Sequence, residues 1–173
     1  MGVSGSGKST IGELLAKRLG SRFVDADSLH PSANIAIMAA GHPLTDDDRW
    51  PWLASAGDVL AASAPAGIVM ACSTLKRSYR DAILAKAPDT KFVHLQGSRE
   101  GLAQRMGHRE DHFMPMSLLC SQLATLEPLE TDEPGVTVDI ASEPAAIVDR
   151  IVRELFDSSL CCTLALCGPF VGL

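Results

Sequence analysis

The chain opens with the stretch Met1-Gly2-Val3-Ser4-Gly5-Ser6-Gly7-Lys8-Ser9-Thr10, which decides the fold. It contains the pattern Gly-x-x-x-x-Gly-Lys-[Ser/Thr], which is typical of a loop that binds nucleotide phosphates. The glycines let backbone N–H groups curl around a phosphate in conformations that a Cβ would disfavour. Apolar residues follow at helical spacing, which predicts a helix from about Gly7 to Leu19. The alternative is a glycine- and serine-rich loop ahead of an ordinary helix.

The motif assigns a chemical role to each part of this loop. We expect ATP to bind here, with Lys8 reaching the β- and γ-phosphates and Ser9 ligating Mg²⁺. The positive end of the helix dipole adds to the attraction for phosphate. The predicted nucleotide-binding residues are Gly2, Ser4, Gly5, Ser6, Gly7, Lys8, Ser9 and Thr10.

Length and composition indicate one globular domain in a reducing compartment. The chain has 173 residues, of which 46% are apolar and 21% charged, and its net charge of −6 argues against a nucleic-acid-binding surface. Its five cysteines are odd in number and lack zinc-ligand spacing, so we expect free thiols. No signal peptide or membrane-length apolar run is visible, which predicts a soluble, cytoplasmic protein.

Apolar strand segments alternate with helical segments along the rest of the chain. Because this order is typical of α/β proteins, we predict a doubly wound parallel sheet flanked by helices, with a small helical substrate or lid region. In such sheets ligands bind at the carboxyl ends of the strands. The expected strands are 22–27, 67–72, 91–95 and 136–140, and the later helices are about 100–106, 117–126 and 144–156.

The strand predicted over Arg22–Asp27 ends in two acids. Side chains alternate along a strand, so Asp25 and Asp27 are expected on one face at its carboxyl end. Beside a phosphate loop, Asp25 would help to hold Mg²⁺ through water and Asp27 would grip or deprotonate a hydroxyl. The alternative is a solvated turn at the end of the strand.

Five cationic residues, at three places in the chain, are candidates for ligand contacts. Arg49 lies beside two tryptophans, whereas Lys76 and Arg80 occupy a predicted helix start, where cations oppose the helix dipole. Arg105 and Arg109 stand four residues apart, so on one helix they would neutralise the charge of a transferring phosphoryl group. A solvated surface is the alternative for Lys76 and Arg80 and for the pair Arg105 and Arg109. The acids after Thr45 are explained by a helix start, with Thr45 or Asp46 as N-cap.

Taken together, these segments resemble the small P-loop gluconate kinases, and more distantly shikimate kinases and nucleoside monophosphate kinases. The phosphate loop alone indicates only the superfamily, and the later segments are more specific. The resemblance runs from Gly2 to about Phe156 and rests on residues 2–9, 25–27, 30–31, Asn34, Met38, 41–53, 71–81, 112–115, Leu118, Leu119, Ser121, Gln122, Leu126 and Glu127.

The resemblance implies ATP-dependent phosphorylation of the 6-hydroxyl of D-gluconate, which supplies 6-phosphogluconate to the pentose phosphate route. It implies that Asp27 acts as base, that His30, Arg49 and Arg80 contact the sugar acid, and that Arg105 and Arg109 belong to a closing lid. A homodimer is also implied. Two alternatives stay open: a kinase for another small hydroxy acid such as shikimate, and a catalytically silent ATP-binding protein.

The two ends of the chain depart from the family pattern. Only Met1 precedes the phosphate loop, where the family has a strand, so we expect weak stability and a natural start upstream or a truncated isoform. We expect a kinase domain over 1–157 and an atypical apolar tail over 158–173, where Cys161, Cys162 and Cys167 lie.

Overall fold

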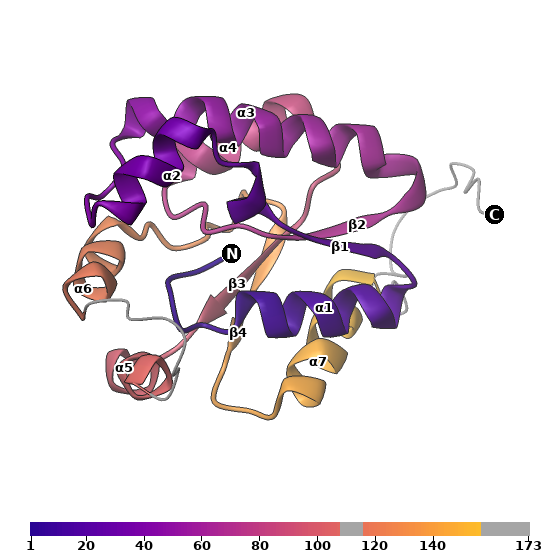
Figure 1. Ribbon diagram of the computed structural model, residues 1–173. Helices are drawn as coiled ribbons and strands as arrows, with labels where there is room; N and C mark the ends of the chain where they lie inside the picture. Colours follow the sequence, from indigo (N-terminus) through magenta and orange to yellow (C-terminus); the bar gives the residue numbers. More distant parts are fainter. Residues whose placement is uncertain (108–115, 157–173) are drawn as a thin grey trace.

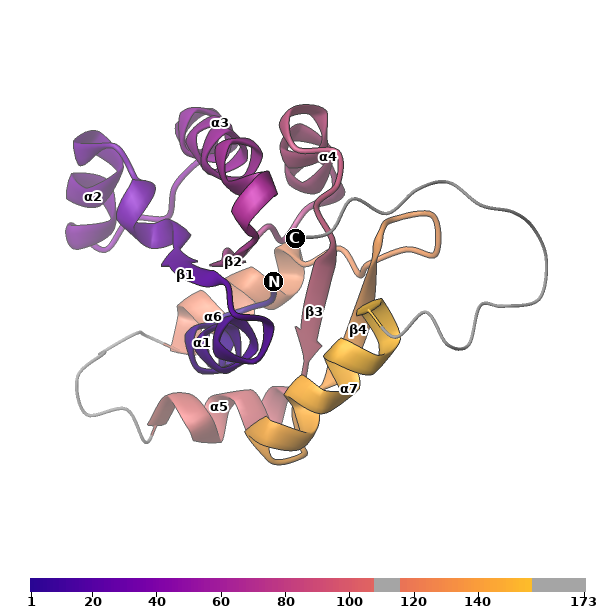
Figure 2. The same ribbon diagram turned by 90° about the vertical axis from the view of Figure 1, so that its right-hand side faces the viewer.

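Parallel strands lie between two layers of helices in the computed structural model, which describes residues 1–107 and 116–156 (Figure 1). Figure 2 shows α3 and α4 on one side of the strands and α1 and α7 on the other. The elements in chain order are α1 (Lys8–Leu19), β1 (Arg22–Asp25), η1 (Ala26–Leu29), α2 (Ser32–Ala39), α3 (Asp46–Ser63), η2 (Ala64–Ala66), β2 (Ile68–Ala71), α4 (Arg77–Lys86), β3 (Phe92–Gln96), α5 (Arg99–Gly107), α6 (Met116–Thr125), β4 (Gly135–Asp139) and α7 (Pro144–Phe156).

The strands form two parallel pairs. β1 pairs with β2, with Asp25 opposite Ala71, and β3 pairs with β4, with Gln96 opposite Asp139. Between the pairs, the N–H of Leu95 donates to the carbonyl oxygen of Met1 at 3.0 Å, and the N–H of Gly2 donates to that of Ser73 at 3.3 Å. The predicted α/β order and parallel strands are therefore confirmed, with the sheet divided between β2 and β3.

Two apolar clusters cover the strands, and both strand pairs contribute to them, since Phe92 of β3 packs with Trp52 and Val69 of β2 packs with the cluster of Leu95. One cluster joins α1, β3, β4 and α7 and includes Leu15, Leu95 and Ile151. The other joins α3, α4 and β2 and includes Trp52 and Ile83. Helices thus cover both faces, which explains why these strands have apolar residues in succession.

Helix boundaries follow the capping residues. Gly20 ends α1 in the left-handed conformation at φ 66°, and its N–H donates to carbonyls of the last turn. Thr45 begins α3 as part of a capping box, in which its hydroxyl accepts from the N–H of Asp48 and its own N–H donates to the Asp48 carboxylate. Thr45 is therefore the N-cap of the two candidates.

The sequence predicts a strand over Arg22–Asp27, and its predicted end is wrong. β1 stops at Asp25 because the Asp25 carboxylate accepts a hydrogen bond from the N–H of Asp27 at 3.1 Å and starts the 3₁₀ helix η1. The position of Asp27 therefore comes from this turn and not from strand alternation.

Two further expectations concern membrane-spanning helices and the end of the chain. No helix in the described ranges is long and apolar enough to cross a membrane. α7 ends at Phe156, and the expected tail 158–173 lies outside the described residues.

Candidate active site

The phosphate-binding loop takes backbone conformations that require glycine. Gly5 and Gly7 have φ of 80° and 85°, and Gly7 is the N-cap of α1 with no side-chain cap. A Cβ on Gly2 would lie 2.9 Å from the carbonyl oxygen of Leu95. The N–H groups of the first turn of α1 therefore point to the loop without a competing side chain, as an anion site requires.

Two polar side chains of the loop fit a phosphate group. The hydroxyl of Ser6 is buried and has no hydrogen-bond partner among the described residues. The amino group of Lys8 donates to the carbonyl oxygen of Val3 at 3.1 Å, so the side chain folds back over the loop. A buried hydroxyl without a partner is costly, and a ligand oxygen at the loop would remove that cost.

Ser9 and Asp25 bring two oxygen ligands together at the end of β1. The Ser9 hydroxyl donates to one carboxylate oxygen of Asp25 at 3.0 Å, while the other oxygen accepts from the N–H of Asp27. A hydroxyl and a carboxylate are ligands that suit Mg²⁺ when phosphate oxygens and water complete the shell. Within the described ranges, no three His, Cys, Asp or Glu side chains gather as a metal site.

Asp27 follows directly in η1 and is exposed. Its carboxylate makes no hydrogen bond or ion pair with another residue that the structure describes. The turn that Asp25 caps therefore presents a carboxylate to solvent next to the Ser9–Asp25 pair.

The side chain of His30 contacts those of Trp52 and Asn34. Its ring stacks on Trp52 at a centroid distance of 4.3 Å, and the indole N–H of Trp52 donates to the carbonyl oxygen of Ala26 at 2.6 Å. The Asn34 amide nitrogen donates to the carbonyl oxygen of Asp48 at 2.7 Å and lies 3.3 Å from Nδ1 of His30. Since an amide nitrogen only donates, Nδ1 accepts and the ring proton is on Nε2.

The same surroundings lower the pKa of His30. Burial of the ring is the main cause, and the charge of Arg49 acts in the same direction, whereas Asp27 opposes both. His30 is therefore neutral at pH 7 and offers an Nε2–H donor.

Arg49 and Lys76 differ in how their charges are balanced. The Lys76 amino group pairs with the Asp46 carboxylate at 2.7 Å, and the Tyr79 hydroxyl donates to the same carboxylate at 2.6 Å. These two bonds lower the pKa of Asp46. Arg49 is half-buried and has no hydrogen bond or ion pair with any described residue. It is therefore the cation of this region that remains open to an anionic ligand.

Arg80 departs from the expected role as a substrate contact. Its side chain is 0% exposed and forms an ion pair with the buried Glu133. The guanidinium also donates to the carbonyl oxygens of Glu127 and Pro128 at 3.1 and 3.2 Å. It thus joins α4 to the segment before β4, and the structure gives it a structural position inside the protein.

Of the two arginines expected in a lid, the structure describes Arg105. Arg105 in α5 donates to the carbonyl oxygen of Ile140, just after β4, at 2.6 Å. Arg109 lies outside the described residues. The expected pairing of Arg105 with Arg109 over the loop therefore stays a prediction.

Sequence reasoning assigned no role to three residues that shape the site. Asn34 fixes the proton of His30, Gln122 in α6 accepts from the N–H of Ser4 at 2.7 Å, and Tyr79 holds Asp46. Asn34 and Gln122 were part of the family pattern, but an amide has no charge that marks it as functional. Their roles depend on contacts between distant parts of the chain.

The phosphate-binding loop, the parallel strands and the flanking helices define a P-loop kinase. The family model described as shikimate kinase matches residues 4–155. A gluconokinase of Gluconobacter oxydans is 48% identical over 89% of this chain and 88% of its own length, and the thermosensitive gluconokinase of Escherichia coli is 41% identical over 87% and 82%. The chain belongs to the shikimate kinase family, in its gluconokinase group.

Solved structures agree with this membership. The crystal structure of a gluconokinase from Sinorhizobium meliloti has a TM-score of 0.83 and 48% identity, and the match covers 94% of this chain and 95% of that one. A shikimate kinase from Aquifex aeolicus has a TM-score of 0.59 at 16% identity, a likeness that concerns the fold alone. The family uses a nucleotide and a small-molecule substrate.

Proposed function

We propose that the protein transfers the γ-phosphoryl group of ATP to the 6-hydroxyl of D-gluconate, giving 6-phosphogluconate and ADP. The observation that carries this proposal is the hydrogen bond between Ser9 and Asp25 at the phosphate loop, next to the open carboxylate of Asp27. This contact supports a metal site at Ser9 and Asp25 with a base beside it. The gluconokinase relatives support the choice of substrate.

The phosphate loop would hold ATP through charge and backbone donors. N–H groups at the start of α1 would bind the phosphates, and Lys8 would leave the Val3 carbonyl to reach the β- and γ-phosphates. Ser9 and Asp25 would hold Mg²⁺, Asp25 through water. Bound there, Mg²⁺ would neutralise negative charge on the phosphates.

Asp27 would position the acceptor hydroxyl and take its proton. It is suited to this because no described partner occupies its carboxylate and because it follows Asp25 in the same turn. A base must lie about 3 Å from the oxygen whose proton it removes. For Asp27 to act as the base, the acceptor hydroxyl must therefore bind beside the Ser9–Asp25 pair.

Arg49 and His30 would recognise the sugar acid. A guanidinium makes two parallel hydrogen bonds to a carboxylate, and Arg49 has no competing ion pair among the described residues. The Nε2–H of His30 would donate to a hydroxyl of the substrate. Lys76 would act at longer range, since Asp46 already balances much of its charge.

Arg105 and Arg109 would contribute only if the region between α5 and α6 closes over ATP. Arg105 would then exchange the Ile140 carbonyl for a phosphate oxygen. Charge neutralisation of this kind supports phosphoryl transfer in P-loop enzymes.

A coupled ADP-release assay over a panel of sugar acids, with shikimate included, tests the proposal. We expect turnover with D-gluconate to exceed turnover with every other acid. Faster turnover with shikimate would favour the other hydroxy-acid kinase, and no acid-dependent ADP release at all would favour a silent ATP-binding protein.

A further inference from the structure

Three backbone N–H groups of the phosphate-binding loop are anchored to the protein itself. The N–H of Gly2 donates to a carbonyl oxygen just after β2, and that of Ser6 donates to the carbonyl oxygen of Val3, both at 3.3 Å. The N–H of Ser4 donates to the amide oxygen of Gln122, in α6, at 2.7 Å. Of these three acceptors, Gln122 contributes a side chain, which a substitution can remove.

Two other N–H groups of the loop alternate with these anchors. Those of Gly5 and Gly7 make no hydrogen bond with another residue in the described part of the chain, and both glycines have positive φ, 80° and 85°. Residues 2, 4 and 6 therefore hold the loop, while Gly5 and Gly7 keep their N–H groups available to a ligand. An anion-binding loop needs this division, because an N–H group that meets a phosphate cannot also hold the loop in shape.

The hydrogen bond from Ser4 to Gln122 also fixes the carbonyl group of Val3. The peptide bond between Val3 and Ser4 is planar, so its N–H and C=O groups turn together. The Val3 carbonyl oxygen accepts from the N–H of Ser6 at 3.3 Å and from the amino group of Lys8 at 3.1 Å. Gln122 therefore holds one end of a peptide group whose other end binds Lys8.

The helix α6 keeps Gln122 in a fixed place beside the loop (Figure 1). Leu119 is buried in the apolar cluster that joins α1, β3, β4 and α7, and Leu123 packs against the same cluster. Leu119 and Gln122 are three residues apart, so they share a face of the helix. Just after α6, the N–H of Glu127 donates to the carbonyl oxygen of Leu75 at 2.8 Å. The helix is thus attached to the core independently of the loop, and Gln122 is a firmly placed acceptor.

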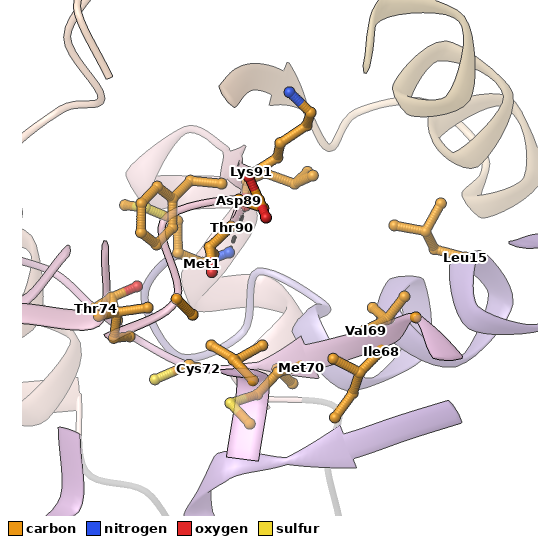
Figure 3. A pocket seen from close by; sticks show the side chains of 18 of the residues that line it. Met1, Leu15, Ile68, Val69, Met70, Cys72, Thr74, Asp89, Thr90 and Lys91 are labelled. Carbon is orange, nitrogen blue, oxygen red and sulfur yellow. Dashed lines mark hydrogen bonds between the residues drawn. The ribbon is translucent and has the colours of Figure 1, made fainter. Parts of the chain in front are cut away.

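The contact between Ser4 and Gln122 lies apart from the cavity of about 640 Å³ that Figure 3 shows. Lys8 and Thr74 are among the residues that line this cavity, whereas Ser4 and Gln122 are not. A substitution at Gln122 therefore leaves the side chains of the cavity wall unchanged. Its effect on ligand binding reports on the loop.

We propose that Gln122 is a positioning residue for ATP, which holds the phosphate-binding loop in its binding conformation through the N–H of Ser4. The inference rests on the proposed binding of ATP at this loop. It assigns the N–H of Ser4 to the protein and those of Gly5 and Gly7 to phosphate oxygens. Without the Gln122 oxygen, the peptide group between Val3 and Ser4 is free to rotate. ATP must then order the loop as it binds, which lowers its affinity.

Amide hydrogen exchange in the full-length protein, read by nitrogen-15 NMR, tests the assignment without any substitution. We expect slow exchange at Ser4 with and without ATP, because Gln122 binds its N–H in both states. Gly5 and Gly7 should exchange fast without ATP and at least about tenfold more slowly with it. Protection of Ser4 that appears only with ATP would overturn the proposal. No change at Gly5 and Gly7 would overturn the binding of ATP at the loop, and with it the proposed function.

Two substitutions at Gln122 separate the hydrogen bond from the rest of the side chain. Gln122→Met keeps the length and removes the acceptor, whereas Gln122→Glu keeps an acceptor oxygen. In the methionine variant we expect fast exchange at Ser4 and a Kd for ATP about three- to tenfold higher, the effect of one neutral hydrogen bond. KM for gluconate should stay the same, and Gln122→Glu should restore slow exchange at Ser4. Gln104→Met, at an exposed position of α5, is the matched control and should bind ATP as the parent does.

Two results with these variants would overturn the proposal. One is an unchanged Kd for ATP in Gln122→Met. The other is an equal rise in the Kd for ATP and in KM for gluconate, because Gln122 would then stabilise the whole fold and not the loop. If the methionine variant does not fold, exchange at Ser4 in the parent and in Gln122→Glu decides: slow exchange in both supports the proposal, and fast exchange in the parent overturns it.

Discussion

The substitution Arg80→Met tests whether Arg80 stabilises the fold or contacts the substrate. The Arg80 and Glu133 side chains are 0% and 1% exposed, and the substitution would leave the Glu133 carboxylate buried without its cation. Breaking a buried pair in this way costs about 3–5 kcal/mol. Since a domain is stable by about 5–15 kcal/mol, this would remove a large part of the stability. At about 2–4 °C per kcal/mol, Arg80→Met should lower Tm by about 6–20 °C.

Urea unfolding followed by tryptophan fluorescence measures this loss, since Trp52 is buried beside α4. The double variant Arg80→Met/Glu133→Leu should recover most of the loss, because apolar residues often replace a buried ion pair at little cost. Arg150→Met is the control, since its pair with Glu154 is exposed and its removal should change stability by no more than about 0.5 kcal/mol. A loss under about 1 kcal/mol for Arg80→Met, together with a higher KM for gluconate, would refute the structural role.

Three further predictions concern catalysis and pH. Asp27→Asn should lower kcat by about 100-fold or more while the Kd for ATP stays the same, and near-normal turnover would remove Asp27 from the mechanism. Arg49→Lys should raise KM for gluconate far more than KM for ATP, because lysine lacks the planar fork; equal increases would indicate a structural arginine. The hydrogen bonds from Arg80 lower the pKa of Glu133 below its usual 4.5, so stability from this group is present above pH 4.5 and is lost as the pH falls below it. Urea midpoints from pH 6 to 3 should therefore fall less in Arg80→Met/Glu133→Leu than in the parent, and parallel curves would contradict the assignment.

Features of the fold that depend on neighbouring residues could be predicted from the sequence. The glycines of the phosphate loop, Gly20 after α1 and Thr45 before α3 act through local backbone conformation or local hydrogen bonds. The strand–helix alternation came from apolar patterns that span a few residues each. Because each of these signals lies within a few consecutive residues, it can be recognised without knowledge of the tertiary structure.

Features that depend on distant contacts could not be predicted in the same way. Arg80 resembles a ligand-binding cation until Glu133, 53 residues later, is seen beside it. The tautomer of His30 depends on Asn34, whose amide is oriented in turn by the carbonyl of Asp48. Asp27 was expected at a strand end because strand alternation was assumed, whereas the Asp25 carboxylate ends the strand first.

The identity of the phosphorylated atom tests the central claim most directly. Protein, ATP, Mg²⁺ and carbon-13-labelled D-gluconate are incubated together, and the product is read by carbon-13 and phosphorus-31 NMR. The proposed function predicts one phosphate ester, with phosphorus coupling at C6 of gluconate and an equal amount of ADP. Hydrolysis of ATP that leaves gluconate unchanged, or an ester at another carbon, would contradict the assignment of the site.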